Sequence, residues 1–205
     1  TTPTIEGTAE AGSTVELFNG DTSLGTATTG SDGTFSITTG ELDDADYSLT
    51  VTATDTAGNT SSASTALELK IDTAAPEAPV ITTDTELTNI NTPTIVGTAE
   101  AGSTVELFNG AISLGTETAG SDGSFSITSS QLPDNDYTLT VKATDALGNE
   151  STASNELAIT IDATAPSTPT ITTTTALTNN NTPVIEGTAE AGSTVNLYND
   201  TQSAT

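Results

Sequence analysis

Residues 97–110 read GTAEAGSTVELFNG, and the same sequence stands at residues 7–20. Its first nine letters occur once more, at residues 187–195. Within the stretch, Val105 and Leu107 alternate with polar residues, which is the period of a β-strand with one buried face. The closing Asn-Gly pair is typical of a tight turn between antiparallel strands. The stretch therefore predicts a β-strand and turn that the chain copies at a fixed spacing.

The copies define a repeat of 90 residues, as the spacing of Pro3, Pro93 and Pro183 shows. Such a unit is too long for one turn of a solenoid and has the size of a small independent domain. We therefore expect tandem domains rather than one continuous core. The expected units are 1–72, which lacks its first strand, 73–162, which is complete, and 163–205, which holds only the first three strands.

Alternating apolar and polar residues continue through the middle unit, separated by turns rich in Gly, Asn and Asp. No stretch has the period of a helix. Tyr47 and Tyr137 stand where the sixth strand begins, the position of a tyrosine corner. Seven short strands in one such unit predict an all-β fold of tandem Ig-like seven-stranded β-sandwich repeats, strung end to end. The predicted strands of the middle unit are 79–83, 93–99, 104–109, 112–119, 124–129, 137–145 and 153–161.

The composition narrows the possible functions. The chain has a formal net charge of −26 and contains no Cys, His, Met or Trp. Without Cys and His there is no disulfide, no zinc or haem site of the usual ligands, and no Ser–His or Cys–His nucleophile. Two lysines cannot neutralise nucleic-acid phosphates or an anionic membrane surface, and no apolar run is long enough for membrane insertion. Hard cations remain as partners, because carboxylate oxygens are their preferred ligands.

Strand order predicts where acidic residues gather. If successive strands are antiparallel, every second loop returns to the pole at which the chain enters the unit. In the middle unit, that pole receives Glu100, Asp122 and Asp145 from three loops and Asp72 from the linker. We therefore predict a Ca²⁺ site at the junction of the first two units, with Mg²⁺ as the alternative ion. The corresponding candidate ligands elsewhere are Glu10, Asp32 and Asp55 in the first unit, and Asp162 and Glu190 at the second junction.

Each of these residues also has a simpler interpretation, because Asp-Gly and Asp-x-x-Gly-Asn are ordinary turn sequences. Convergence of four carboxylates on one pole, repeated in each unit, is what favours the cation. Asn59 and Asn149 are expected to cap their turns. Four acids at the opposite pole, beside the corner tyrosines, are expected to be turn residues: Asp44, Asp46, Asp134 and Asp136.

Four motifs in this order resemble the bacterial Ig-like repeats of giant secreted adhesins, the biofilm-associated and RTX-type surface proteins. They are TPTIxGTAEAGSTVELF, SDGTFSIT, YSLTVTATDTAGN and the linker IDTAAP. The resemblance implies an extracellular stalk in which Ca²⁺ at the domain junctions stiffens the string. It also implies that the ligands are Asp72, Glu100, Asp122 and Asp145.

Three classes of function remain open. The first is a structural spacer whose partners are neighbouring repeats of the same long chain, which near-identical repeats favour. The second is a module that binds glycans, partner chains or other copies of itself through exposed strand edges or loops. In one form of it, residues 163–205 supply the missing strand to another copy, and the chain is a filament subunit. The third is a glycosidase with a carboxylate pair, which needs a cleft and sugar-stacking aromatic residues. We therefore expect no enzymatic activity.

Overall fold

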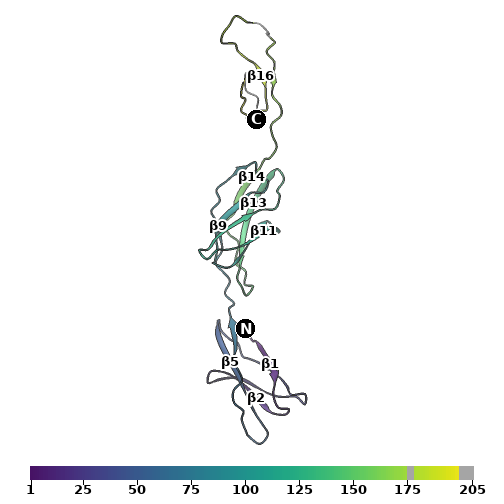
Figure 1. Cartoon of the computed structure of the whole chain (residues 1–205), viewed down its shortest axis with the longest axis vertical. Coiled ribbons are helices and arrows are strands. Elements are labelled where there is room, and N and C mark those ends of the chain that lie inside the picture. The colour runs from purple at the N-terminus through teal and green to yellow at the C-terminus, as the bar shows by residue number, and fades with distance from the viewer. Residues whose placement is uncertain (175–177, 199–205) are drawn as a thin grey trace.

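The computed structural model describes residues 1–174 and 178–198, and within them all regular structure is β. None of the described residues forms a helix that could cross a membrane. Figure 1 shows three successive units along one long axis, joined by single extended linkers. The predicted all-β fold and the string of separate units are both present.

The middle unit is a sandwich of two sheets. One sheet has the order β12-β9-β7 and the other has the order β11-β10-β13-β14-β8. All neighbouring strands are antiparallel except β8, which lies parallel to β14. The strands are β7 (Val80–Ile81), β8 (Leu87–Thr88), β9 (Thr94–Thr98), β10 (Thr104–Asn109), β11 (Ile112–Thr118), β12 (Ser124–Thr128), β13 (Asn135–Thr144) and β14 (Leu157–Ile161).

Two strands at the ends of the repeat differ from the prediction. The expected first strand is shortened to β7, and a second short strand, β8, follows it. The expected last strand, 153–161, begins only at Leu157. Before that point, the hydroxyls of Ser151 and Ser154 accept hydrogen bonds from two β13 amides, at 2.9 and 3.0 Å. Since these hydroxyls pair with amides on the edge of β13, the residues just before Leu157 do not need regular strand pairing with it.

The core of the middle unit lies between its two sheets. Ile95 on one sheet and Val105, Leu107 and Leu139 on the other have no accessible surface. These residues occupy alternate positions along their strands, so their neighbours face solvent. Tyr137 donates a hydrogen bond to the Pro133 carbonyl at 2.9 Å, which confirms the predicted tyrosine corner.

The first unit repeats this sandwich without the counterparts of β7 and β8. Its two sheets have the orders β1-β4 and β3-β2-β5-β6, with the same pairing register as the middle unit. Tyr47 forms the second tyrosine corner, with the Asp43 carbonyl at 3.0 Å. The strands are β1 (Thr4–Thr8), β2 (Thr14–Asn19), β3 (Thr22–Thr28), β4 (Thr34–Thr38), β5 (Ala45–Thr54) and β6 (Leu67–Ile71).

The described part of the third unit contains two short antiparallel strands, β15 (Thr170–Ile171) and β16 (Gly187–Thr188). Residues 194–198, where a third strand is expected, form no strand, and the rest of that position lies outside the described residues. Val195 and Leu197 are 59% and 69% exposed, because no second sheet formed by the described residues covers them. Without that burial, the alternating pattern alone does not hold a strand.

Candidate junction sites

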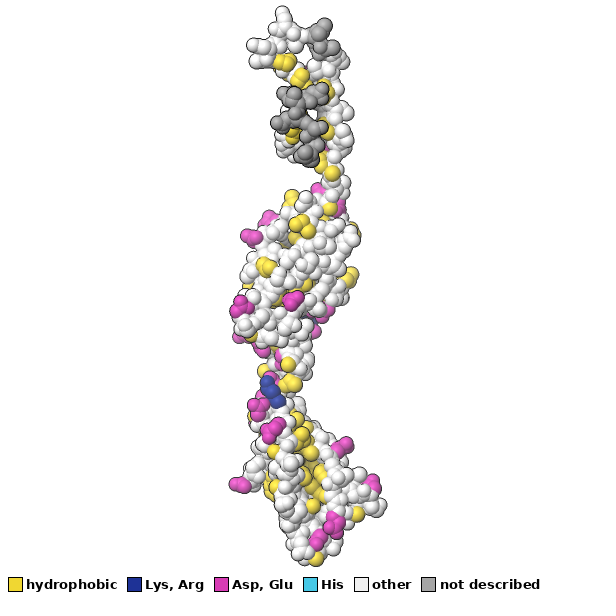
Figure 2. Space-filling view, in the orientation of Figure 1, with side chains coloured by type: hydrophobic (Ala, Val, Ile, Leu, Met, Phe, Trp, Pro, Cys, Tyr) yellow, Lys and Arg dark blue, Asp and Glu magenta, His cyan; other side chains and the backbone are white. Residues whose placement is uncertain are grey.

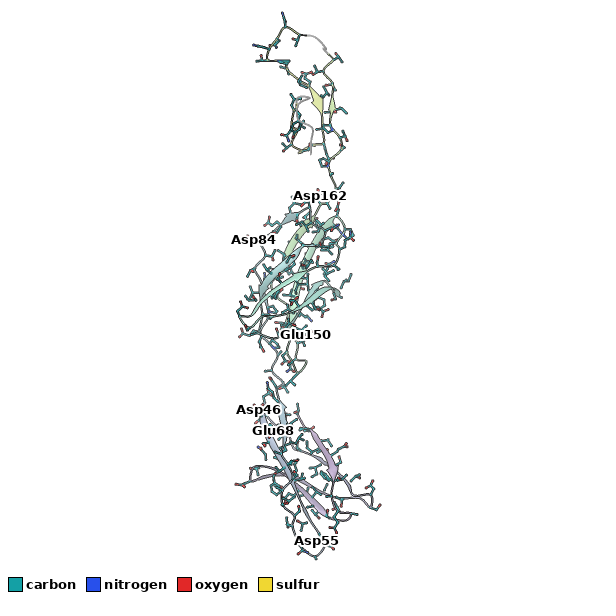
Figure 3. The ribbon with its side chains drawn as sticks, in the orientation of Figure 1. Asp46, Asp55, Glu68, Asp84, Glu150 and Asp162 are labelled. Carbon is teal, nitrogen blue, oxygen red and sulfur yellow. The ribbon has the colours of Figure 1, made fainter. Side chains whose placement is uncertain are left out.

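The loops predicted to share a pole do lie together in the middle unit. The Ala99 amide donates to the Gly123 carbonyl at 2.8 Å, and the Ala119 amide donates to the Ser103 carbonyl at 2.9 Å. These bonds join the loop after β9 to the loop after β11. The loop after β13 lies at the same end, where Glu150 marks the lower pole of the middle unit in Figure 3. The assumption that successive strands are antiparallel therefore predicted correctly that these loops lie at one pole.

Asp122 caps the turn between β11 and β12. Its Oδ1 accepts hydrogen bonds from the Ser124 hydroxyl at 2.7 Å and from the Ser124 amide at 3.0 Å. These two bonds favour the charged form and lower the pKa of Asp122 below its usual range. Gly123 has φ of +80°, and a Cβ there would lie 2.7 Å from the Ala99 carbonyl, so the turn requires glycine. Asp32 makes the same bonds to Thr34, which likewise lower the pKa of Asp32.

Asp145 organises the turn after β13. Its Oδ1 accepts from the amides of Leu147 at 2.8 Å and Asn149 at 2.9 Å, and its Oδ2 accepts from Asn149 Nδ2 at 2.8 Å. The Asn149 side chain is the main cause of a lowered pKa for Asp145, and the backbone amides add to it. In the first unit, Asp55 makes the equivalent bonds, with a lowered pKa for the same reasons.

Asn149 also connects the middle unit to the linker. Its Nδ2 donates to the backbone carbonyl of Asp72 at 2.9 Å, across 77 residues of sequence. The Asp72 carboxylate points elsewhere: Oδ1 accepts from the Ala74 amide at 3.2 Å, and Oδ2 lies 3.4 Å from Lys70 Nζ. Figure 2 shows a basic side chain at the narrow waist between the lower and middle units, with acidic side chains on both sides. Asp72 thus contacts the middle unit through its backbone carbonyl, whereas its carboxylate contacts residues of its own segment.

A second contact fastens the linker to the first unit. Asp44 Oδ1 accepts from the Thr73 amide at 3.0 Å and from the Thr73 hydroxyl at 2.9 Å. At the next linker, Asp134 accepts from the Ala163 amide at 2.9 Å and from the Thr164 hydroxyl, and these contacts lower the pKa of Asp134. We call the bonds made by Asp44 and Asn149 to residues 72–73 the linker contacts.

The sequence interpretation placed Asp44 and Asp134 in turns and missed their contacts with the linkers. The sequence shows that Asp44 and Asp134 recur at the repeat spacing, but it does not show which groups these carboxylates bind. The hydrogen-bonded partners lie 29 residues further along the chain. Only the folded arrangement of β5 and β6, or of β13 and β14, brings those partners together.

The remaining predicted residues lie at the poles in smaller groups. Glu100 and Glu77 line one shallow hollow of the middle unit, and Glu10 and Asp55 line another at the pole of the first unit that lies away from the linker. At the second junction, the Glu190 carboxylate accepts from the Ser167 amide at 3.0 Å. Asp162 Oδ1 accepts from the Thr164 amide at 3.3 Å. Figure 3 shows Asp55 at the lower end of the first unit and Asp162 at the upper end of the middle unit.

The predicted ligands have the right chemistry for a hard cation. They are carboxylates whose oxygens keep lone pairs that the hydrogen bonds of their turns do not use. Their grouping is looser than a binding site needs. Within residues 1–174 and 178–198, no three acidic side chains lie close enough to form a cation-binding group. Glu100 is exposed and can rotate, whereas Asp122 and Asp145 are held by their turns. The structure thus shows a shared pole and no assembled set of ligands.

Comparison with known proteins gives matches over most of the chain. A chitinase A1 of Niallia circulans is 35% identical over 153 residues, which are 70% of this chain and 21% of the chitinase. An exoglucanase B of Cellulomonas fimi is 33% identical over 172 residues, which are 75% of this chain and 15% of the exoglucanase. The chain therefore spans about a fifth or less of these curated relatives.

Among solved structures, a biofilm associated protein, BSP domain, is 28% identical. The similarity covers 80% of this chain and 28% of that one, with a TM-score of 0.35. The family described as bacterial Ig-like domain matches residues 1–73 and 80–163, which include both units that form sandwiches. The chain belongs to the bacterial Ig-like domain family.

Proposed function

We propose that the chain is a spacer segment of a large extracellular bacterial adhesin, which holds neighbouring modules apart at a fixed distance. The linker contacts carry this proposal. Asp44 fastens residue 73 to the first unit, and Asn149 fastens residue 72 to the middle unit, so both ends of the junction are bonded. In the middle unit the chain enters at one pole and leaves at the other, so the linkers before and after it lie at its two ends (Figure 1).

The composition and surface support this function. A net charge of −26 keeps the chain soluble and opposes folding of one unit onto another. The absence of cysteine suits a segment that needs no redox chemistry outside the cell. Small-angle scattering of the chain is the direct test of shape. We expect the profile of a rod with the cross-section of one sandwich, and a compact particle would contradict the spacer.

We also propose that the chain is not catalytic, although its relatives are named as a chitinase and an exoglucanase. The match covers only 21% and 15% of those proteins, so most of each enzyme lies outside it. The whole chain has four Phe, three Tyr and no Trp, which leaves few side chains to stack on sugars. Purified chain incubated with chitin and with cellulose should release no soluble sugar. Release that Asp122→Asn or Glu100→Gln abolishes would overturn this part of the proposal.

Finally, we propose that Ca²⁺ binds at the junction and strengthens it. The support is the shared pole of Glu100, Asp122 and Asp145 and the adjacent linker residue Asp72. Binding requires the exposed Glu100 side chain to rotate toward the linker, since no three carboxylates in the described part of the chain are grouped as they stand. A cation there would also screen the repulsion between the acids of the two facing poles.

The Ca²⁺ test compares calorimetric titration and thermal melts in Ca²⁺, Mg²⁺ and EDTA. Binding to the folded state alone adds about 2.7 kcal/mol at a hundredfold excess over Kd, which raises Tm by several degrees. Glu100→Gln should reduce the response, whereas Glu156→Gln, with the same charge change midway along the sandwich beside the start of β14, should not. An unchanged melting curve in millimolar Ca²⁺ would contradict Ca²⁺ binding at the junction. It would not contradict the spacer function, because the linker contacts are hydrogen bonds between protein atoms.

A further inference from the structure

The strands that follow the entry of the chain into the middle unit are bonded to the strand that precedes its exit. β8 lies near the start of the unit and β14 at its end, and the two strands pair in parallel. The Thr160 amide donates to the Glu86 carbonyl at 2.8 Å. The Asp162 amide donates to the Thr88 carbonyl at 3.0 Å. The incoming and outgoing segments are therefore joined directly by backbone hydrogen bonds.

The positions of the two linkers fix the direction in which tension would pull each strand. The chain enters at the lower pole, where Asn149 binds the Asp72 carbonyl, and it leaves at the upper pole, which Asp162 marks in Figure 3. Since β14 ends at Asp162 and β8 is parallel to it, both strands run toward the upper pole. Tension between the linkers therefore draws β8 toward the lower pole and β14 toward the upper pole, so that the strands slide along each other.

Sliding loads the hydrogen bonds of a strand pair differently from peeling. Interstrand bonds run across the strands, so a force along the strands strains all of them together. A force that separates the strands at one end strains only the first bond, and the bonds then break one after another. Because a single hydrogen bond contributes little net stability, simultaneous loading is what lets a short strand pair resist force.

A side chain connects β7 to the outgoing segment in the same way. Asn155, two residues before β14, accepts from the Ile81 amide at 2.9 Å and donates to the Ile81 carbonyl at 3.3 Å. The next amide, of Thr82, donates to the Val96 carbonyl of β9 at 2.9 Å, so Asn155 takes the side of β7 that β9 leaves free. Ile81 is only 5% exposed, so water has little access to these bonds.

We propose that the middle unit carries tension between its neighbours through a clamp, which consists of the contacts of β8 with β14 and of Ile81 with Asn155. Both contacts join the segment that enters the unit to the segment that leaves it, so the force passes between the linkers without passing through β10 to β13. This function goes beyond the proposed spacer, which needs a fixed separation and no resistance to force. It requires no cation, because every contact of the clamp is between protein atoms.

The test is single-molecule pulling of the full chain in EDTA, with the force applied in two directions. The chain has no cysteine, so introduced cysteines define where the handles attach. Handles at Ala75→Cys and Ala165→Cys, which are equivalent exposed positions of the two linkers, make β8 slide along β14. Handles at Ile90→Cys and Ala165→Cys pull from the upper pole alone and peel the strands apart. The released length, about 3.3–3.6 Å for each residue between the handles, identifies the unfolding of this unit.

At the same constant force, the folded unit should last roughly tenfold longer or more under sliding than under peeling, since several hydrogen bonds then break in one step. Asn155→Ala should shorten the lifetime under sliding by roughly fivefold, the effect of its lost hydrogen bonds. It should leave the lifetime under peeling unchanged, because β7 is then not loaded. Ser124→Ala, which removes a 2.7 Å hydrogen bond outside the clamp, should change neither lifetime.

Two results would overturn the clamp. One is an equal lifetime in the two pulling directions, and the other is a loss from Asn155→Ala that is the same in both. Neither result would contradict the proposed spacer function, which the scattering profile tests without applied force.

Discussion

At the residue scale, Asn149 is the side chain on which the junction depends most. One amide nitrogen donates both to the Asp72 carbonyl of the linker and to the Asp145 carboxylate of its own turn. The position of the linker and the ionisation of Asp145 are therefore coupled through a single group. In the first unit, Asn59 makes only the bond within its turn among the described contacts.

Replacing Asn149 by alanine should reveal this coupling. Loss of the Nδ2 donor removes the main cause of the lowered pKa, so the pKa of Asp145 should rise toward its ordinary value. The pKa of Asp122 should not change, because Ser124 holds it in a separate turn. Carboxyl chemical shifts recorded during an acid titration measure both residues in one sample. Equal shifts at Asp122 and Asp145 would show a general disturbance instead.

The lowered pKa values also fix the sign of the acid response. Asp32, Asp55, Asp122, Asp134 and Asp145 all bind protons less readily in the folded chain than in the unfolded chain. Their stabilising effect is complete above the unfolded pKa of about 3.9 and is lost as the pH falls through the folded values. Thermal melts in 0.5 M NaCl should therefore show Tm falling below about pH 4. A Tm that rises throughout that window would contradict these turn contacts.

At the element scale, the two sandwiches show what the short strand β7 contributes. The paired sheets have the same register with and without it, so β7 is not needed to define the fold. Its contribution is burial: Val141 is inaccessible in the middle unit, whereas Val51 is half-buried in the first unit. We therefore expect the middle unit to be the more stable of the two.

Two isoleucines at equivalent positions provide a matched comparison. Ile81→Ala should lower the free energy of unfolding of the middle unit by about 2–4 kcal/mol, because it leaves a cavity under β7. Ile171→Ala should change stability by less than about 0.5 kcal/mol, since Ile171 is 68% exposed. Denaturant unfolding followed by amide exchange separates the units. A similar loss for both variants would mean that β7 is not part of the core.

The strands could be predicted from the sequence wherever local alternation is long enough to define a face. β10, with Val105 and Leu107 inward, is such a strand, and its predicted bounds agree with the structure. β8 has only two residues, which is too short for any period, and it forms because the Thr160 and Asp162 amides need partners. The start of β14 was wrong because the Ser151 and Ser154 hydroxyls replace strand pairing there.

The junction was predictable only in part. Alternation of antiparallel strands placed Glu100, Asp122 and Asp145 at one pole, and that placement is correct. The partner of each carboxylate depends on loop backbone geometry, which the alternation does not contain. The contact between Asn149 and Asp72 crosses 77 residues and uses a main-chain carbonyl, which no side-chain pattern identifies. The Ca²⁺ site remains a prediction.

At the scale of the whole molecule, the proposed stiffness comes from a linker that is hydrogen-bonded to the units it joins and that recurs along the chain. The pattern recurs at the second junction, where Asp134 binds residues 163 and 164 as Asp44 binds residue 73. The middle unit adds its own length because the chain enters it at one pole and leaves it at the other (Figure 1). The proposed spacer function therefore depends on the linker contacts more than on any one core residue.

The central claim is that the linker contacts hold the first two units at a fixed separation. The chain has no cysteine, so Thr26→Cys and Thr116→Cys, at equivalent exposed positions, allow spin labels to be attached at two defined sites. Pulsed electron–electron double resonance should give one narrow distribution of distances between the two spin labels. The distribution should broaden when Asn149→Ala and Asp44→Ala are added. A broad distribution before those substitutions, or one that they leave unchanged, would contradict the account.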